Sequence, residues 1–182
     1  DIEFEGMRVS LQSEQGAIIL FDFEAAFPSV SHEFMFRVLE HLKLPAHVLH
    51  FIRSLYDDNR CRLLLSGQSF EGFRMESGIR QGCPLSPMLF AVVVDVLLRR
   101  LARKFPTSTP RAFADDTAIV VKDFRACAKD LAEEFNSFEQ ISGLKLNMPK
   151  CVIIPLWDTA GMDVAGFIRQ CEPSWSGMGF SS

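Results

Sequence analysis

Apolar positions in the first quarter of the chain follow two different spacings. Residues 17–23 (AIILFDF) form a short continuous apolar run, which is typical of a buried strand and ends near Asp22. Ser31 is a favourable helix N-cap, and Pro45 suits the first turn of a second helix. Both are followed by apolar residues at helical spacing, so this part of the sequence predicts a strand and then two helices.

The middle of the chain predicts a small β pair and a long helix. Residues 61–65 and 69–75 are β-like, with a Ser-Gly turn signal between them. After a loop rich in Gly and Pro at 78–87, residues 87–104 are apolar on nearly every side. A helix with that pattern is expected to be buried in the middle of its domain.

Two further elements surround a pair of acids. Residues 111–121 (RAFADDTAIVV) contain two short apolar segments with Asp115 and Asp116 between them, which predicts a hairpin with the acids at its tip. Apolar residues at alternating spacings of four and three predict an amphipathic helix over 124–141, which Gly143 ends.

The order of the elements defines the fold class. Residues 151–156 (CVIIPL) predict a closing strand, and no element is predicted from Trp157 onward. Strand, helices, β pair, helix, hairpin, helix and strand together predict an α+β fold, with an antiparallel sheet and helices packed on one face.

Composition narrows the class of protein. The chain has 182 residues, 48% hydrophobic and 23% charged, values of a globular domain rather than a disordered segment. No apolar run reaches the length of about 18 residues that a membrane span needs, so no membrane partner is predicted. Five cysteines without a C-x-x-C pair favour a reducing intracellular setting over a disulfide framework or zinc site. His47 and His50 lack neighbours at metal-binding spacing and are expected to be ordinary surface or core histidines.

The net charge of −4 conceals a local basic excess. Residues 80–111 contain six Lys or Arg residues and a single acid, Asp95. That excess would suit a polyanion. A solvated helix end explains it equally simply.

Three acids carry the candidate chemistry. Asp22 ends one predicted strand, and Asp115 and Asp116 occupy a predicted hairpin tip, so the three converge if the two strands are neighbours. Close carboxylates repel one another, and divalent cations such as Mg²⁺ remove that penalty. Two such ions can hold the attacking and leaving oxygens of an in-line phosphoryl displacement. The alternative is that Asp-Asp is simply a favourable turn.

Four motifs give these acids a context. Residues 22–27 (DFEAAF) match D-x-x-x-A-[FY], and residues 113–116 (FADD) match [FY]-x-D-D. Residues 77–87 contain R-Q-G-C-P-L-S-P, and residues 142–150 (SGLKLNMPK) match S-G-L-x-x-N-x-x-K. In this order the motifs resemble those of reverse transcriptases from non-LTR (LINE-type) retrotransposons.

The resemblance implies a polymerase palm and an activity. The chain is expected to be the palm of an RNA-directed DNA polymerase, a nucleotidyltransferase that adds dNTPs to a primer 3′-OH by a two-metal-ion mechanism. The implied cofactor is Mg²⁺, two ions, with Mn²⁺ as a substitute. The implied partners are an RNA template, a DNA primer and dNTPs.

The resemblance also assigns catalytic roles. Asp22 and Asp115 would be metal ligands, and Asp116 a supporting acid. Lys150 would lie near the departing pyrophosphate as a cation or proton donor. An ordinary surface lysine is the alternative for this position.

Nucleotide-binding roles fall on two segments. The backbone around Phe23 would approach the incoming triphosphate, and Phe27 would lie under the deoxyribose and exclude a 2′-OH. Phe27 could instead be a plain core aromatic. Gln81 and Gly82 would line the nascent base pair and template, and Arg80 would contact template or nucleotide phosphate.

Domain boundaries follow from the same resemblance. Residues 1–156 are expected to be the palm with part of the fingers, and residues 157–182 a tail leading toward a primer grip and thumb that the sequence lacks. The chain begins without Met and is expected to be a piece of a larger polyprotein with a thumb and an endonuclease, which would place it in the nucleus if it is part of a retrotransposon.

Two other functions compete with this interpretation. The first is a catalytically inactive, retroelement-derived fragment that binds nucleic acid or a protein. The second, an RNA-templated RNA polymerase, shares the acids, but Phe27 and the R-Q-G-C-P-L-S-P block count against it.

Overall fold

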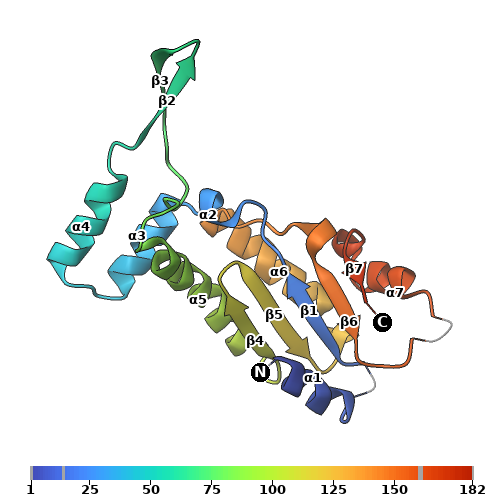
Figure 1. The fold of residues 1–182 in the computed structure, drawn as a ribbon. Coiled ribbons are helices and arrows are strands. Elements are labelled where there is room, and N and C mark those ends of the chain that lie inside the picture. The colour runs from blue at the N-terminus through green and yellow to red at the C-terminus, as the bar shows by residue number, and fades with distance from the viewer. Residues whose placement is uncertain (1, 14, 160–161, 182) are drawn as a thin grey trace.

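The centre of the molecule is a five-stranded sheet, with strands in the order β4-β5-β1-β6-β7 (Figure 1). The computed structural model describes residues 2–13, 15–159 and 162–181. The strands are β1 (Ala17–Phe21), β4 (Thr109–Phe113), β5 (Asp116–Val121), β6 (Val152–Pro155) and β7 (Gly179–Phe180). β1 pairs antiparallel with β5 and β6, and β4 pairs antiparallel with β5. β7 runs parallel to β6, so the predicted antiparallel arrangement holds everywhere except at this edge.

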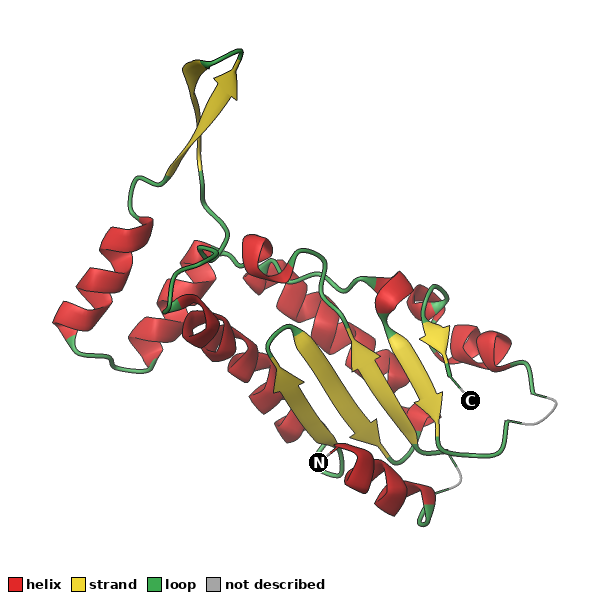
Figure 2. Cartoon of the chain, in the orientation of Figure 1, coloured by secondary structure: helices red, strands yellow, loops and turns green. Residues whose placement is uncertain are grey.

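Two long helices cover one face of the sheet (Figure 2). They are α5 (Ser86–Lys104) and α6 (Phe124–Ser142). Alternate β1 residues point toward them, and the ring centroid of Phe21 lies 4.2 Å from that of Phe135. Gly143 ends α6 in the left-handed conformation, as predicted.

The opposite face is covered only in part, by a helix that the hydrophobic pattern did not predict. Helix α1 (Ile2–Ser10) packs on this face, and a Cβ on its Gly6 would meet the Ile18 side chain at 2.6 Å. The α+β fold predicted from the sequence is confirmed, with α1 as an addition on the second face.

The segment between β1 and α5 forms a lobe that packs against α5 and α6 through α3 (Figure 1). It contains α2 (Ala26–Ser29), α3 (His32–His41), α4 (Ala46–Tyr56), β2 (Arg60–Leu65) and β3 (Gln68–Arg74). Ser31 caps α3 by accepting a hydrogen bond from the Phe34 amide, whereas Pro45 is the N-cap of α4 rather than a residue of its first turn. The β2–β3 hairpin projects from the body and is exposed along almost its whole length.

Helix α5 is less buried than its composition predicted. Its inner face is buried, but Met88 is 63% exposed and Arg99 faces solvent. The helix contacts the edge strand β4 and the helices α3 and α6 through its buried residues, and its remaining face is open to solvent.

The C-terminal segment folds onto the same core. After β6 come α7 (Val164–Cys171), the 3₁₀ helix η2 (Pro173–Trp175) and β7. Trp175 is 1% exposed and packs against Phe21 and Phe124. All five cysteines are free thiols. In the described ranges, no helix has the length and apolar character to cross a membrane.

Candidate functional site

The three predicted acids lie at the same end of two neighbouring strands, β1 and β5. Asp22 directly follows β1, Asp115 lies in the β4–β5 turn, and Asp116 begins β5. The register pairs Phe21 with Thr117, and one further step places Asp22 opposite Asp116. Opposite residues of an antiparallel pair share a face, so both carboxylates lie on the face away from α5 and α6.

Asp22 has an unusual environment for a carboxylate. Its Oδ2 atom is buried and accepts no hydrogen bond, although 26% of the side chain is exposed. The Lys150 ammonium lies 3.8 Å from this oxygen, which is an ion-pair distance rather than a hydrogen bond. A buried carboxylate oxygen without a donor is costly, so this atom is suited to receive a cation.

The main chain of Asp22 is held firmly. The Asn147 amide donates to the Asp22 carbonyl at 2.8 Å, and the Asp22 amide lies 3.4 Å from the Cys151 sulfur. Burial raises the pKa of the Cys151 thiol, and the neighbouring Asp22 charge adds to this effect. The thiol therefore stays protonated and neutral beside the carboxylate.

The donor set fits a divalent ion that needs substrate to complete its shell. Within the part of the chain that the structure describes, no three His, Cys, Asp or Glu side chains form a cluster that could hold a metal unaided. Mg²⁺ usually binds through one or two carboxylates, with waters and substrate phosphates as the other ligands. The Asp22 oxygen that accepts no hydrogen bond and the exposed Asp115 and Asp116 match that requirement.

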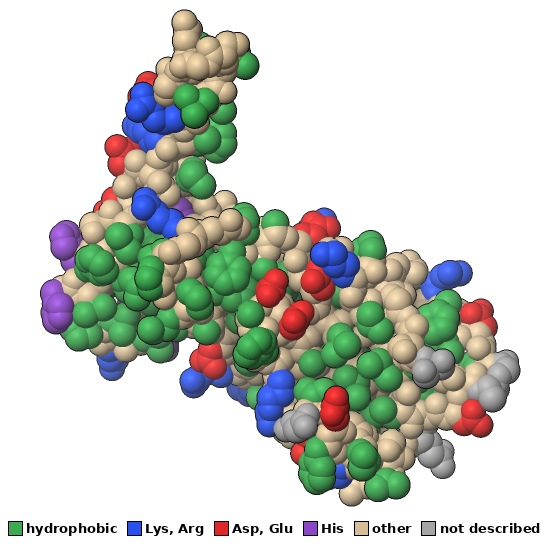
Figure 3. Space-filling view, in the orientation of Figure 1, with side chains coloured by type: hydrophobic (Ala, Val, Ile, Leu, Met, Phe, Trp, Pro, Cys, Tyr) green, Lys and Arg blue, Asp and Glu red, His purple; other side chains and the backbone are tan. Residues whose placement is uncertain are grey.

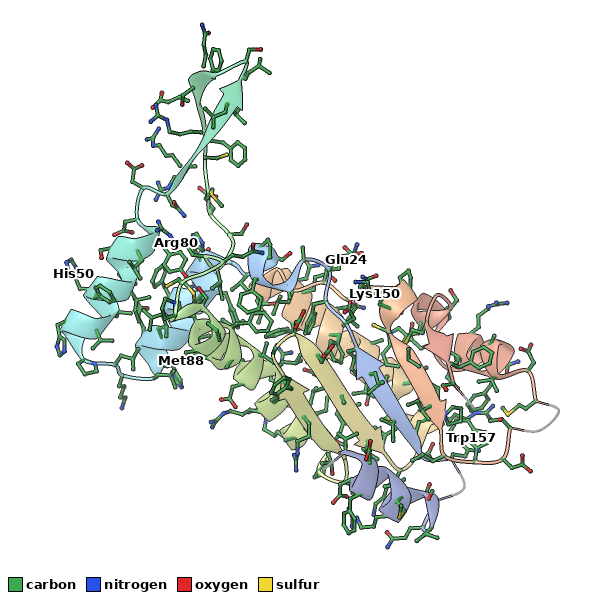
Figure 4. All side chains as sticks on the ribbon, viewed as in Figure 1. Glu24, His50, Arg80, Met88, Lys150 and Trp157 are labelled. Atoms are coloured by element: carbon green, nitrogen blue, oxygen red, sulfur yellow. The ribbon has the colours of Figure 1, made fainter. Side chains whose placement is uncertain are left out.

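A second segment lies against the strand end that carries Asp22. The Glu24 amide donates to the Lys145 carbonyl at 2.9 Å, and Phe23 pairs with Leu146 in an antiparallel bridge. The Lys145 ammonium also lies 3.1 Å from Glu24 Oε2. Figure 4 labels Glu24 and Lys150 in the region of the strand ends. The sequence pattern gives no sign of the Lys145 ion pair, because its partner Glu24 lies 121 residues away in the chain.

The two predicted nucleotide-binding phenylalanines differ in exposure. Phe23 is 4% exposed and its ring packs near Phe135, so only its backbone can reach a substrate. Phe27 is half-buried and stacks on Phe90 with centroids 4.6 Å apart. It also lines an apolar groove of about 1230 Å³ between α3, α5 and the β4–β5 turn. Phe27 therefore contacts both the core and open space.

The loop before α5 is attached to the segment after Asp22. The Gly78 amide donates to Val30 at 2.8 Å, and the Ile79 amide donates to Phe27 at 2.7 Å. Gln81 is exposed, and Gly82 has φ +82° with nothing within 4 Å of the point where a Cβ would stand. The loop thus leaves room for another molecule at these two residues.

Arg80 lies in a different place from the acids. It donates to Asn59 Oδ1 at 3.2 Å, and its guanidinium lies 6.0 Å from the centroid of the Tyr56 ring. Figure 4 places it beside α4, away from Lys150. The structure therefore brings Lys150 to Asp22 and leaves Arg80 in the lobe.

Three of the six basic residues of 80–111 form ion pairs on the helices. Arg99 pairs with Asp95 at 2.6 Å, and Arg100 and Lys104 pair with Glu134 at 2.8 and 3.3 Å. Figure 3 shows Lys and Arg side chains scattered over the visible face, with acidic side chains gathered in its middle. These pairs support the helix-end interpretation for Arg99, Arg100 and Lys104.

The motifs, fold and acids together define a polymerase family. A sequence model described as reverse transcriptase (RNA-dependent DNA polymerase) matches residues 5–168, and the chain belongs to this family. The resemblance to non-LTR retrotransposon enzymes is confirmed by relatives that include Pol polyproteins of R2 elements.

Among these relatives, the retrovirus-related Pol polyprotein of retrotransposable element R2DM from Drosophila melanogaster is 32% identical over 139 residues, covering 73% of this chain and 13% of that protein. The R2 polyprotein of Nasonia vitripennis is 30% identical over 145 residues, covering 76% of this chain and 14% of that protein. The chain therefore spans only a small part of the relatives that it matches.

Solved structures of telomerase share the fold. Telomerase from Candida tropicalis in complex with a telomeric RNA fragment superposes with a TM-score of 0.66 at 14% identity, covering 88% of this chain and 29% of that one. An apo form truncated from its C-terminal domain gives 0.64 at 15% identity, covering 85% and 33%. At this identity the likeness concerns the palm-type fold alone.

Proposed function

We propose that this domain catalyses RNA-directed DNA synthesis, adding dNTPs to the 3′-OH of a DNA primer on an RNA template. The observation that supports this most strongly is the buried Oδ2 of Asp22, which accepts no hydrogen bond, at the strand end beside the β4–β5 turn. Family membership supports the same reaction class.

Asp22 and Asp115 would hold two Mg²⁺ ions, with Asp116 as a supporting acid. When bound, such ions stabilise the attacking and leaving oxygens of phosphoryl transfer. The chain's contribution is positional: the hydrogen bond from the Asn147 amide fixes Asp22, and a turn of two residues presents Asp115. Lys150 would supply a positive charge, or a proton, to the departing pyrophosphate.

The nucleotide would lie between this acid group and the loop before α5. The backbone at Phe23 would approach the triphosphate, while Phe27 would contact the sugar. Gln81 and Gly82 have the exposure that contact with the base pair and template requires. Arg80 would reach a phosphate of the template from the side of α4.

The domain organisation is part of the same proposal. Residues 1–156 would form the palm with part of the fingers, and residues 157–182 would lead toward a primer grip and thumb. The packing of Trp175 in the palm core and the pairing of β7 with β6 support treating the later part of this segment as an extension of the palm.

Primer extension by the natural protein tests the proposal. We expect Asp115→Asn to remove nearly all incorporation of dNTPs on an RNA template while leaving the melting temperature unchanged, because the side chain is exposed and an amide has nearly the same shape as a carboxylate. Substantial incorporation by this variant would favour the alternative, a nucleic-acid or protein binding module without catalysis.

A further inference from the structure

We propose that Lys150 is a built-in counter-cation of Asp22, which competes with divalent ions for this carboxylate and is released when they bind. The inference rests on the proposed function, because it concerns the same acid. It adds a step in which the lysine changes partner.

The geometry places one mobile cation against one fixed anion. The Lys150 ammonium lies 3.8 Å from Asp22 Oδ2, the oxygen that accepts no hydrogen bond. The lysine side chain is 69% exposed, whereas that of Asp22 is 26% exposed. Lys150 can therefore turn into solvent without losing packing, while Asp22 stays in place.

The backbone keeps Lys150 within reach of Asp22 in either position. Lys150 ends the 3₁₀ helix η1 (Met148–Lys150), and its amide donates to the Asn147 carbonyl at 2.9 Å. Asn147 in turn donates to the Asp22 carbonyl at 2.8 Å. This chain of hydrogen bonds fixes the lysine backbone and leaves the side chain as the moving part.

The neighbouring lysine has a different partner. Lys145 pairs with Glu24 at 3.1 Å, at the far end of the same short pairing between residues 145–147 and 22–24. Each lysine of this segment thus has its own carboxylate, and Lys150 is the one directed at the candidate ion site.

An incoming divalent ion would reverse the balance of charge at Asp22. The ion would neutralise the carboxylate and repel the ammonium, so Lys150 would lose its attraction and turn outward. The phosphates of a bound nucleotide offer the nearest class of anion to receive it. Because the pair is partly exposed and screened by salt, removing the lysine should tighten ion binding by about 3- to 10-fold, not by several hundred-fold.

Mn²⁺ binding to the purified chain, followed by electron paramagnetic resonance of free Mn²⁺, tests the competition. We expect Lys150→Met to tighten Mn²⁺ binding by about 3- to 10-fold at low salt, with a smaller difference at high salt. Lys129→Met is the matched control. It removes the same positive charge from an exposed residue in the first turns of α6. That end of α6 lies beside Gln15 rather than Asp22. This control should bind Mn²⁺ as the unaltered chain does.

The outcomes separate this inference from the proposed function. Unchanged or weaker Mn²⁺ binding by Lys150→Met, or equal tightening by Lys129→Met, overturns the competition. Asp22→Asn should remove the Mn²⁺ binding that Lys150→Met strengthens, and if it binds Mn²⁺ normally the proposed ion site itself is wrong. Melting curves of each variant verify that it is folded.

Discussion

The Nε2 atom of His32 lies 2.8 Å from the carbonyl oxygen of Gly78 and joins α3 to the loop before α5. A carbonyl can only accept, so this nitrogen carries the proton. His32 is 9% exposed, and its ring meets that of Tyr56 edge-on at 4.9 Å. This contact helps to hold the loop that carries Gln81 and Gly82 next to the segment that follows Asp22.

Removing the His32 ring should weaken both the fold and the loop. We expect His32→Ala to lower the free energy of unfolding by about 1–3 kcal/mol, because the Gly78 carbonyl loses its donor in a half-buried position. Urea denaturation measures the loss. The exposed His50, on α4, supplies the control, and His50→Ala should change stability by less than about 0.5 kcal/mol. Equal effects of the two variants would show that the contact with Gly78 contributes little.

Replacing Gly143 by any residue with a side chain should destabilise the fold, for two reasons that can be tested separately. Its φ is +79°, and a Cβ would lie 2.3 Å from the Ser29 carbonyl oxygen. Gly67 has nearly the same φ, +80°, but nothing within 4 Å of the Cβ position. Gly67→Ala should therefore cost only the conformational term of about 1 kcal/mol, whereas Gly143→Ala should cost clearly more. Urea midpoints that agree for the two variants would contradict the close approach of α6 to Ser29.

Cys127 should make the protein less stable at alkaline pH. Burial, with Asp123 as the second cause, raises the pKa of this thiol to about 12. In the unfolded chain a thiol ionises near pH ~8.5, so above that pH the unfolded state holds fewer protons than the folded state. Stability then falls as pH rises, by up to about 1.4 kcal/mol per pH unit for this group. Unfolding free energies between pH 8 and 10.5 should decline less steeply for Cys127→Ala, and an unchanged slope would refute the burial effect.

Phe27 could act in the selection of the nucleotide sugar, in the packing of the core, or in both. If its ring closes the space for a ribose 2′-OH, Phe27→Val should raise the use of rNTPs relative to dNTPs by about 10- to 100-fold, corresponding to an overpacking cost of roughly 1–3 kcal/mol. The stacking on Phe90 means that some stability will also be lost. The two incorporation rates and the melting temperature should be measured together. A lower melting temperature with an unchanged rNTP/dNTP ratio would make Phe27 a core residue only.

Elements with a strong periodic pattern could be predicted from sequence, and elements held by tertiary contacts could not. The amphipathic spacing of α6 corresponds to the buried residues Phe124, Leu131 and Phe138. In contrast, α1 leaves Phe4 and Met7 more than 60% exposed, so its pattern gave no clear signal. Strand β7 has only two residues and depends on its pairing with β6.

The candidate site also has a part that could be predicted from the sequence and a part that could not. The positions of its acids could be predicted from the sequence. Asp22 follows an apolar run, and Asp115 and Asp116 separate two others, so each lies at the end of a predicted strand. The ion pairs could not, because Lys145 and Lys150 meet Glu24 and Asp22 only after residues 145–147 pair with a strand end far away in the sequence. Local patterns carry no information about that register.

Anomalous diffraction from crystals soaked with Mn²⁺ and a dNTP, with a primer–template bound, tests the central claim most directly. We expect Mn²⁺ peaks bound by the carboxylates of Asp22 and Asp115, with those carboxylates about 4–7 Å apart and the ions about 3.5–4 Å apart. Manganese bound elsewhere, or Asp22 and Asp115 more than about 12 Å apart in a well-ordered complex, would contradict a shared two-ion site.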